Sequence, residues 1–137
     1  MKINVKALSG CEPEQHGDWI DLKASEDIIY LKGEIITVNL GVCIELPEGY
    51  EAHLLPRSST FKKYDVIMVN SMGIIDNAYC GDNDWWKIQF YALNSGYISK
   101  GDRIAQFRIM PVQENITINQ VMSLKNPDRG GIGSTGR

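Results

Sequence analysis

Short runs of apolar, mostly β-branched residues alternate along the chain with turn-forming residues. Residues 35–40 and 66–69 are two such runs, and Gly-containing turn signals stand between the runs, for example at 47–49 and 94–96. No long stretch carries the i, i+3, i+4, i+7 spacing of an amphipathic helix. The pattern therefore predicts an all-β, antiparallel domain, a barrel or a sandwich, without long helices.

The last stretch of the chain departs from this pattern. It is rich in glycine and has almost no apolar side chain, so it has little to bury. We therefore predict a single-domain β-barrel core of residues 1–124 and a flexible, glycine-rich arm of residues 125–137. Closely spaced glycines let backbone N–H groups converge on a phosphate, and Ser134 and Thr135 add hydroxyl donors. A flexible tail that binds no ligand is the alternative.

Composition narrows the class of protein. The chain has 137 residues, 43% of them hydrophobic and 23% charged, and a net charge of −3, so it lacks the basic excess of a nucleic-acid binder. No apolar stretch is long enough to cross a membrane. Three cysteines without CxxC spacing and two histidines do not form a zinc motif. We expect a cytoplasmic protein with free thiols and no nucleic-acid or membrane partner.

Three polar stretches interrupt the apolar runs. Arg57 stands beside Ser58, and Gln106 follows a Gly-Asp-Arg turn; each alone is typical of a solvated turn or a strand entry. Asp76 follows an apolar Ile-Ile pair, and Tyr79 comes three residues later. A carboxylate at a strand end can act as a general base and a tyrosine ring can form the wall of a sugar pocket. The alternatives are a turn-capping Asp76 and a core Tyr79.

Five stretches occur together in one order, and the chain resembles the homotrimeric dUTPase family in that order. They are GDWIDLKA (17–24), PRSST (56–60), GIIDNAYCGD (73–82), GDRIAQ (101–106) and RGGIGSTG (129–136). Any one of these stretches arises easily by chance, whereas the ordered set does not.

The resemblance implies a fold, an assembly and a reaction. It implies a distorted, jelly-roll-like β-barrel that forms a homotrimer with shared active sites, in which the arm of one chain reaches over a site formed by others. The implied reaction converts dUTP and water to dUMP and pyrophosphate, with Mg²⁺ bound to the three phosphates.

The resemblance also implies a role for individual residues. Asp76 would orient and deprotonate the water that attacks the α-phosphorus. Asp21 would hold magnesium through its water shell. Arg57, Ser58 and Gln106 would contact the phosphates.

The uracil would lie against the hairpin 76–79, where backbone groups and Asn70 read its polar edge. Tyr79 would stack on the deoxyribose and exclude a ribose 2′-hydroxyl. The full set of residues implied to bind substrate is Arg57, Ser58, Ser59, Asn70, Gly73, Ile75, Tyr79, Gln106, Arg129, Gly131, Ile132, Gly133, Ser134 and Thr135.

Two features depart from the family pattern. Ile132 stands where the family has a phenylalanine that closes over the uracil, and the arm is shorter between Arg129 and the later glycines. Trp85 and Trp86 follow the third motif, and either could supply the missing stacking surface. Packing of both rings in the core or at a subunit contact is the alternative.

Two other functions compete with this interpretation. A dCTP deaminase is the nearest alternative enzyme, but the third motif favours hydrolysis. A nucleotide-sensing or protein-binding module is the other, and Asp76 and Gln106 argue against loss of catalysis while leaving open a second role with a regulatory protein partner.

Overall fold

The structure, a computed structural model of the chain, describes residues 1–133 and 136. In this part the chain forms twelve strands and one short helix, α1 (Thr60–Tyr64). The strands are β1 (Asn4–Ala7), β2 (Glu14–His16), β3 (Trp19–Lys23), β4 (Ile28–Tyr30), β5 (Ile35–Asn39), β6 (Val42–Glu45), β7 (Tyr50–Leu55), β8 (Val66–Met68), β9 (Gly73–Ile75), β10 (Lys87–Ala92), β11 (Gly96–Ile98) and β12 (Arg103–Pro111).

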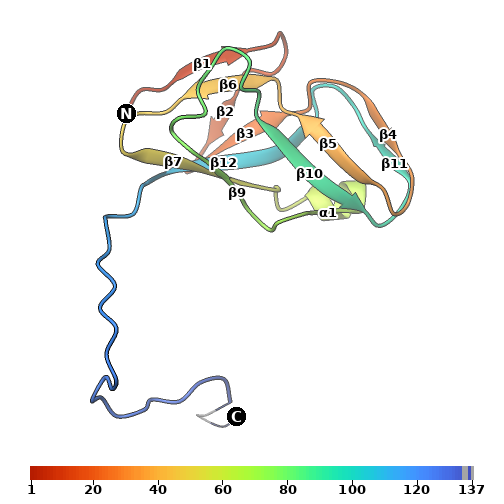
Figure 1. Cartoon of the computed structure of the whole chain (residues 1–137). Helices are drawn as coiled ribbons and strands as arrows, with labels where there is room; N and C mark the ends of the chain where they lie inside the picture. Colours follow the sequence, from red (N-terminus) through yellow and green to blue (C-terminus); the bar gives the residue numbers. More distant parts are fainter. Residues whose placement is uncertain (134–135, 137) are drawn as a thin grey trace.

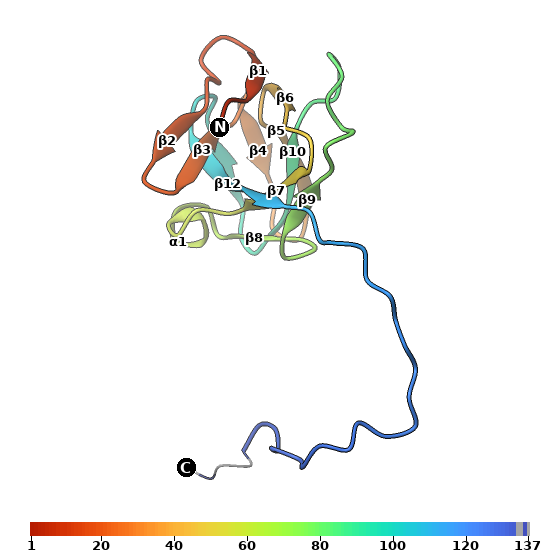
Figure 2. The same cartoon turned by 90° about the vertical axis from the view of Figure 1, so that its left-hand side faces the viewer.

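Most strand pairs join strands that are not consecutive in the chain, and every pair is antiparallel. The largest sheet has the order β2-β3-β12-β7-β9, and a second has the order β5-β10-β8. Two further pairs, β1-β6 and β11-β4, complete the body. Figures 1 and 2 show these strands wrapped around one centre. The prediction of an all-β, jelly-roll-like barrel without long helices is confirmed.

The core follows from the alternation of apolar and polar residues in the strands. In β10, Ile88, Phe90 and Ala92 are buried while the residues between them face solvent. Trp86, immediately before β10, is 1% exposed and meets Phe107 of β12 edge to face, with ring centroids 4.9 Å apart. Burial of such aromatic rings supplies much of the apolar area that stabilises the barrel.

The strands end at Pro111, well before the predicted boundary at residue 124. Residues 112–133 are exposed and run away from the barrel in both views (Figures 1 and 2). Val112 is still attached, because its N–H donates to the carbonyl of Gly49 at 2.9 Å. The division into a core and an arm at residue 124 stays a prediction.

Two further properties of the described residues bear on class. No helix among them is long and apolar enough to span a membrane. The three cysteines are free thiols, of which Cys11 and Cys43 are buried and Cys80 is exposed.

Candidate active site

The register of the largest sheet aligns two of the predicted site residues. Asp21 of β3 lies opposite Gln106 of β12, and Gln106 lies opposite Leu55 of β7. Residues directly opposite each other in antiparallel strands project from the same face of the sheet. Arg57 follows two residues after Leu55 and closes the row. We call Asp21, Arg57 and Gln106 the polar face.

Hydrogen bonds assemble the polar face within one chain. The Nε–H of Arg57 donates to Oδ1 of Asp21 at 3.1 Å, and Nη1 donates to the carbonyl of Arg103 at 3.4 Å. Nε2 of Gln106 donates to the carbonyl of Pro56 at 3.1 Å. Asp21 is only 6% exposed, so its charge is matched by the guanidinium rather than by bulk water. A guanidinium has five N–H donors, so Arg57 keeps donors for an anion.

Ser58 and Ser59 border this face at the start of α1. Ser58 is exposed, and Ser59 is the N-cap residue of α1 but makes no capping hydrogen bond with its side chain. Thr60 instead accepts the backbone N–H of Arg57 on its hydroxyl at 2.9 Å. Ser58 and Ser59 thus follow Arg57 directly in the chain, and the hydroxyl of Ser59 is not used to cap α1.

A second charged cluster extends the polar face to the edge strand, and sequence reasoning missed it. Glu14 of β2 lies opposite Asp21 and forms ion pairs with Lys23 and with Arg103, the latter at 2.9 Å. Hydrogen bonds from Lys23 and then His16, with the charge of Arg103, lower the pKa of Glu14 from 4.5 to about 2. The signal was present in the sequence, since Lys23 stands two residues after Asp21 in a strand and so shares its face.

The second part of the candidate site is a cavity of about 350 Å³ beside the loop between β9 and β10. We call it the loop pocket. It contains both Asp76 and Tyr79, as predicted for a nucleoside pocket. Its lining residues are Ile74, Ile75, Asp76, Tyr79, Trp85, Trp86 and Lys87.

Asp76 begins a tight turn at the edge of this cavity. Its Oδ1 accepts the N–H of Ala78 at 2.8 Å, and its carbonyl accepts the N–H of Tyr79 at 3.0 Å. Asp76 is thus an Asx-type turn residue as well as a candidate base. The turn uses only one carboxylate oxygen, because no second hydrogen bond to a described residue engages Oδ2, which leaves that atom available to a water.

Tyr79 is a pocket residue and not a core aromatic. Its side chain is 39% exposed, and its hydroxyl donates to the carbonyl of Trp85 at 2.9 Å. Partial burial, followed by the nearby charge of Asp84, raises the pKa of Tyr79 above its usual value of 10.0, so the phenol is neutral at physiological pH. Of the two tryptophans, Trp86 belongs to the core, whereas Trp85 is half-buried with Nζ of Lys6 5.1 Å from its ring centroid.

Two residues predicted to bind substrate, one of them by reading the base, lie outside the loop pocket in this chain. Asn70 is exposed in the turn between β8 and β9, where it has a φ of 65° that asparagine tolerates better than most residues. Gly73 begins β9 opposite Leu54, and a Cβ on it would come within 3.2 Å of the Leu54 Cβ. Their roles in substrate binding stay predictions.

The polar face and the loop pocket do not meet within one chain. Ile75 pairs with Ala52 and Gln106 pairs with Leu55, so the two levels are three positions apart on β7, roughly 10 Å, and Asp76 continues further away. β7 also stands between β9 and β12, which adds two strand spacings, roughly 10 Å. Among the described residues, no hydrogen bond or ion pair joins the two parts.

The described residues of the arm reach neither the polar face nor the loop pocket. Arg129, Gly131, Ile132 and Gly133 are exposed at the far end of the extended segment (Figures 1 and 2). The predicted contributions of Ser134 and Thr135 lie outside the described residues.

The described residues offer few protein ligands for a divalent cation. Within the part of the chain that the structure describes, no three His, Cys, Asp or Glu side chains are grouped to bind a metal ion. Asp21 uses Oδ1 for Arg57, and its other oxygen makes no hydrogen bond to a described residue. One free carboxylate oxygen fits a magnesium ion that takes most of its ligands from phosphates and water, and does not fit an all-protein metal cage.

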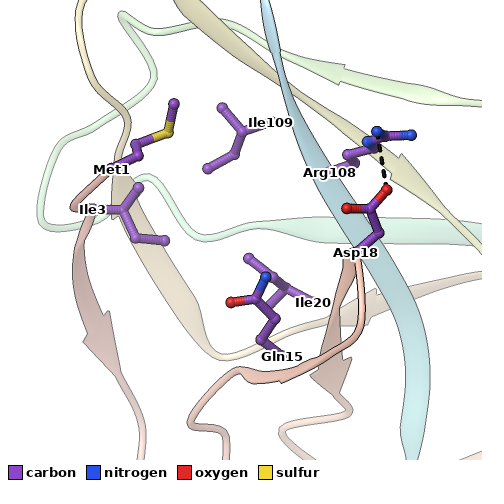
Figure 3. A pocket seen from close by; sticks show the side chains of 7 residues that line it. All are labelled: Met1, Ile3, Gln15, Asp18, Ile20, Arg108 and Ile109. Atoms are coloured by element: carbon purple, nitrogen blue, oxygen red, sulfur yellow. Dashed lines mark ion pairs between the residues drawn. The ribbon is translucent and has the colours of Figure 1, made fainter.

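Another cavity, of about 380 Å³, is lined by residues of the N-terminal segment, β2, β3 and β12 (Figure 3). Arg108 and Asp18 face each other across one side of it, 3.0 Å apart. Met1, Ile3 and Ile109 form its apolar side. None of the predicted site residues lines this cavity.

Comparison with known proteins identifies the family. The sequence model of the family described as dUTPase matches residues 11–136. The chain belongs to the dUTPase family. The SPbeta prophage-derived deoxyuridine 5'-triphosphate nucleotidohydrolase of Bacillus subtilis (strain 168) is 52% identical over 140 residues, which cover 99% of each chain. The deoxyuridine 5'-triphosphate nucleotidohydrolase of Clostridioides difficile is 34% identical over 98% of this chain and 94% of its own.

Solved structures agree with the dUTPase fold. The dUTPase of Streptococcus mutans superposes with a TM-score of 0.76 at 24% identity, over 82% of this chain and 98% of that chain. A dUTPase of Staphylococcus bacteriophage 80alpha, solved with dUpNHpp, superposes with a TM-score of 0.78 at 22% identity, over 99% of each chain. The match to the family model spans all five ordered stretches, and the chain has the fold of these dUTPases.

Proposed function

We propose that the chain hydrolyses dUTP to dUMP and pyrophosphate at a site built from the polar face of one copy and the loop pocket of another. The observation that carries this proposal is the 52% identity, over the full length, to a deoxyuridine 5'-triphosphate nucleotidohydrolase. The geometry supports it, because the chain supplies a preassembled anion-binding face and a separate cavity that contains a carboxylate and a tyrosine.

The polar face binds the triphosphate. Arg57 offers the N–H groups that Asp21 and the Arg103 carbonyl leave unused, and the hydroxyls of Ser58 and Ser59 stand beside it. Each charge-assisted hydrogen bond contributes about 1.5–3 kcal/mol. Gln106 lies in the same row and orients a phosphate oxygen or the attacking water.

Magnesium fits this face as a partner of the substrate. Asp21 would hold the ion through water, with the carboxylate oxygen that Arg57 leaves free. A magnesium ion bound to the triphosphate would supply neutralisation of phosphate charge there.

The chemical step belongs to Asp76. Its carboxylate accepts a proton from a water while the water oxygen forms a bond to the α-phosphorus. The bond between the α-phosphorus and the bridging oxygen breaks, and the electron pair leaves with pyrophosphate. The Asx turn with Ala78 holds one carboxylate oxygen, and the other takes the proton.

The loop pocket selects the nucleoside. Backbone groups of the loop hydrogen-bond to the uracil edge, and a cytosine leaves them unpaired, which can cost roughly 10⁴-fold in discrimination. Tyr79 lies against the deoxyribose, with its hydroxyl fixed on the Trp85 carbonyl, and its ring occupies the space of a 2′-hydroxyl.

A homotrimer with shared sites is part of this proposal. The separation of the polar face from Asp76 requires a second chain to complete the site, and the segment that follows β12 carries apolar side chains that a single chain leaves exposed. These are Val112, Ile116, Ile118, Val121, Met122, Leu124 and Ile132. Burial of such side chains against a neighbouring copy would stabilise the assembly.

Turnover of dUTP, dCTP, UTP and dTTP with magnesium tests the reaction. We expect pyrophosphate release from dUTP alone at an appreciable rate. Ammonia release from dCTP would overturn the proposal in favour of a deaminase, and binding of dUTP without turnover would favour a nucleotide sensor.

Subunit mixing tests the composite site. Asp76→Asn and Arg57→Gln alone are each expected to retain at most about a tenth of the native activity. Unfolding and refolding them together should give mixed trimers in which about a quarter of the sites have both native halves. The matched control mixes Asp76→Asn with the double variant, which cannot build a native site. Absence of recovered activity in the first mixture would contradict a shared site.

A further inference from the structure

One asparagine next to the candidate base has both amide hydrogens engaged by the barrel. Nδ2 of Asn77 donates to the carbonyl of Leu46 at 3.0 Å and to the carbonyl of Pro47 at 2.8 Å. Asn77 is half-buried, whereas Asp76 before it and Ala78 after it are exposed. The side chain therefore joins the β9–β10 loop to the turn between β6 and β7.

The two acceptor carbonyls are fixed to the body. Leu46 is a core residue, 4% exposed. The carbonyl of Pro47 also accepts the N–H of Tyr50 at 3.2 Å, and Gly49 in the same turn accepts the N–H of Val112 at 2.9 Å. Because the carbonyls of Leu46 and Pro47 are fixed to the barrel in this way, their hydrogen bonds fix the position of the Asn77 side chain.

The burial pattern explains how this anchor sets the direction of Asp76. Gly73, Ile75 and Asn77 face the body, while Ile74, Asp76 and Ala78 face outward, so the alternation of β9 continues two residues past its end. No backbone ladder enforces the alternation there. The hydrogen bonds of the Asn77 amide hold residue 77 toward the barrel instead, so that Asp76 faces outward.

Few other contacts tie the start of the loop to the barrel. The bonds of Asp76 with Ala78 and Tyr79 are internal to the turn, and that of Tyr79 with Trp85 is internal to the loop. The loop tip has its own anchor, in which Lys6 donates to the carbonyl of Asp82 at 2.7 Å.

We propose that Asn77 is a positioning residue for hydrolysis: its two hydrogen bonds to the β6–β7 turn hold the carboxylate of Asp76 and the backbone of the base-binding loop in their working positions. The inference rests on the proposed function, since Asn77 affects hydrolysis only by positioning Asp76, the base of the proposed reaction. Asn77 itself touches no reacting atom.

Asn77→Ala removes both donors, and Asn77→Asp places carboxylate oxygens against two carbonyls in the same volume. Both should lower kcat on the order of 10²-fold, the loss that misplacement of a catalytic group by about 1 Å can cause. KM should rise by a much smaller factor than the factor by which kcat falls. The ratio of kcat/KM for dUTP to kcat/KM for dCTP should decrease. Asn77→Ser, which keeps one donor, should fall between wild type and Asn77→Ala.

Asn83→Ala is the matched control, because Asn83 is an exposed asparagine of the same loop without a side-chain hydrogen bond to the described residues. It should behave as wild type. Hydrogen exchange at the amides of Ala78 and Tyr79 should accelerate in Asn77→Ala and not in Asn83→Ala, while exchange in the barrel strands stays unchanged.

The outcomes separate the two proposals. A lower Tm with unchanged kcat well below that Tm, or exchange at Ala78 and Tyr79 equal to the control, would make Asn77 merely structural and overturn the inference. If Asn77→Ala does not fold, the same measurements on Asn77→Ser decide whether Asn77 is a positioning residue. An inactive wild type would overturn the proposed function, while the exchange experiment would still test the anchor.

Discussion

The polar face and the loop pocket differ in how the chain positions their functional groups. Asp21 and Gln106 are interior positions of strands, fixed by ladders on both sides, and Asp21 is 6% exposed with a guanidinium as its partner. Asp76 and Tyr79 stand on a loop, are exposed, and are held by a few hydrogen bonds between side chains and backbone.

This difference predicts that stability and activity separate along the molecule. Changes in the polar face remove buried charge partners and should affect both properties. Changes in the loop should affect activity alone, since exposed groups contribute little to the free energy of unfolding. The arm should behave like the loop in this respect.

The largest effect is expected from Asp76→Asn. The amide keeps the shape of the carboxylate but cannot accept a proton, so kcat should fall by at least about 10²-fold while dUTP still binds. Tm should be unchanged, because Asp76 is exposed. Pyrophosphate release and calorimetric titration with dUTP measure the two quantities. More than about a tenth of the native kcat would remove Asp76 from the role of general base.

Arg57→Ala should affect both activity and stability. It removes phosphate donors, so kcat/KM should fall roughly 10- to 10²-fold, and it leaves Asp21 without its partner, which destabilises the barrel on the order of 1–3 kcal/mol. Arg108→Ala is the control, because Arg108 pairs with the exposed Asp18 and such pairs contribute little. Urea unfolding and turnover measure both. Equal losses of stability in Arg57→Ala and Arg108→Ala would contradict the view that the buried ion pair with Asp21 stabilises the barrel more than an exposed pair does.

Deletion of residues 126–137 should reduce turnover without unfolding the barrel. The described residues of this segment are exposed, so their removal exposes no core. Loss of even one charge-assisted contact with the triphosphate lowers kcat/KM roughly tenfold. Thermal unfolding and turnover with dUTP check both parts. Native activity in the truncated chain would show that residues 126–137 are a plain tail.

Much of this arrangement could be predicted from the sequence. Strand periodicity predicts the all-β class, and the ordered motifs locate Asp21, Arg57, Gln106, Asp76 and Tyr79, because each motif is a local run of residues. Local sequence also explains the turn role of Asp76, since a short polar side chain commonly bonds to the backbone two residues ahead.

Other features depend on long-range register, which a single sequence does not reveal. The contact of Asn77 with Leu46 joins segments that lie far apart along the chain, and no local pattern indicates it. The pairing of Glu14 with Asp21 is local by contrast, because β2 and β3 form a hairpin across the turn Gly17-Asp18. The residue at which β12 ends could not be predicted from the sequence either. Residues 112, 116, 118, 122 and 124 are apolar, as alternate residues of a strand can be, yet this segment pairs with no strand among the described residues.

The smallest expected effect is that of Glu14→Gln, which tests the outer edge of the polar face. Lys23, His16 and Arg103 lower the pKa of Glu14 from 4.5 to about 2. A carboxyl whose pKa is lower in the folded state stabilises that state fully above pH 4.5, and the contribution is lost as pH falls toward 2. The difference in Tm between wild type and Glu14→Gln should therefore be constant at neutral pH and shrink below pH 4.5. It should also shrink at high salt, because the group is exposed and its ion pairs are screened. A difference in Tm that is independent of pH and salt would mean that Glu14 stabilises the fold through packing. Arg57 would then be the one cation of this face whose charge compensates the opposed carboxylates of Glu14 and Asp21.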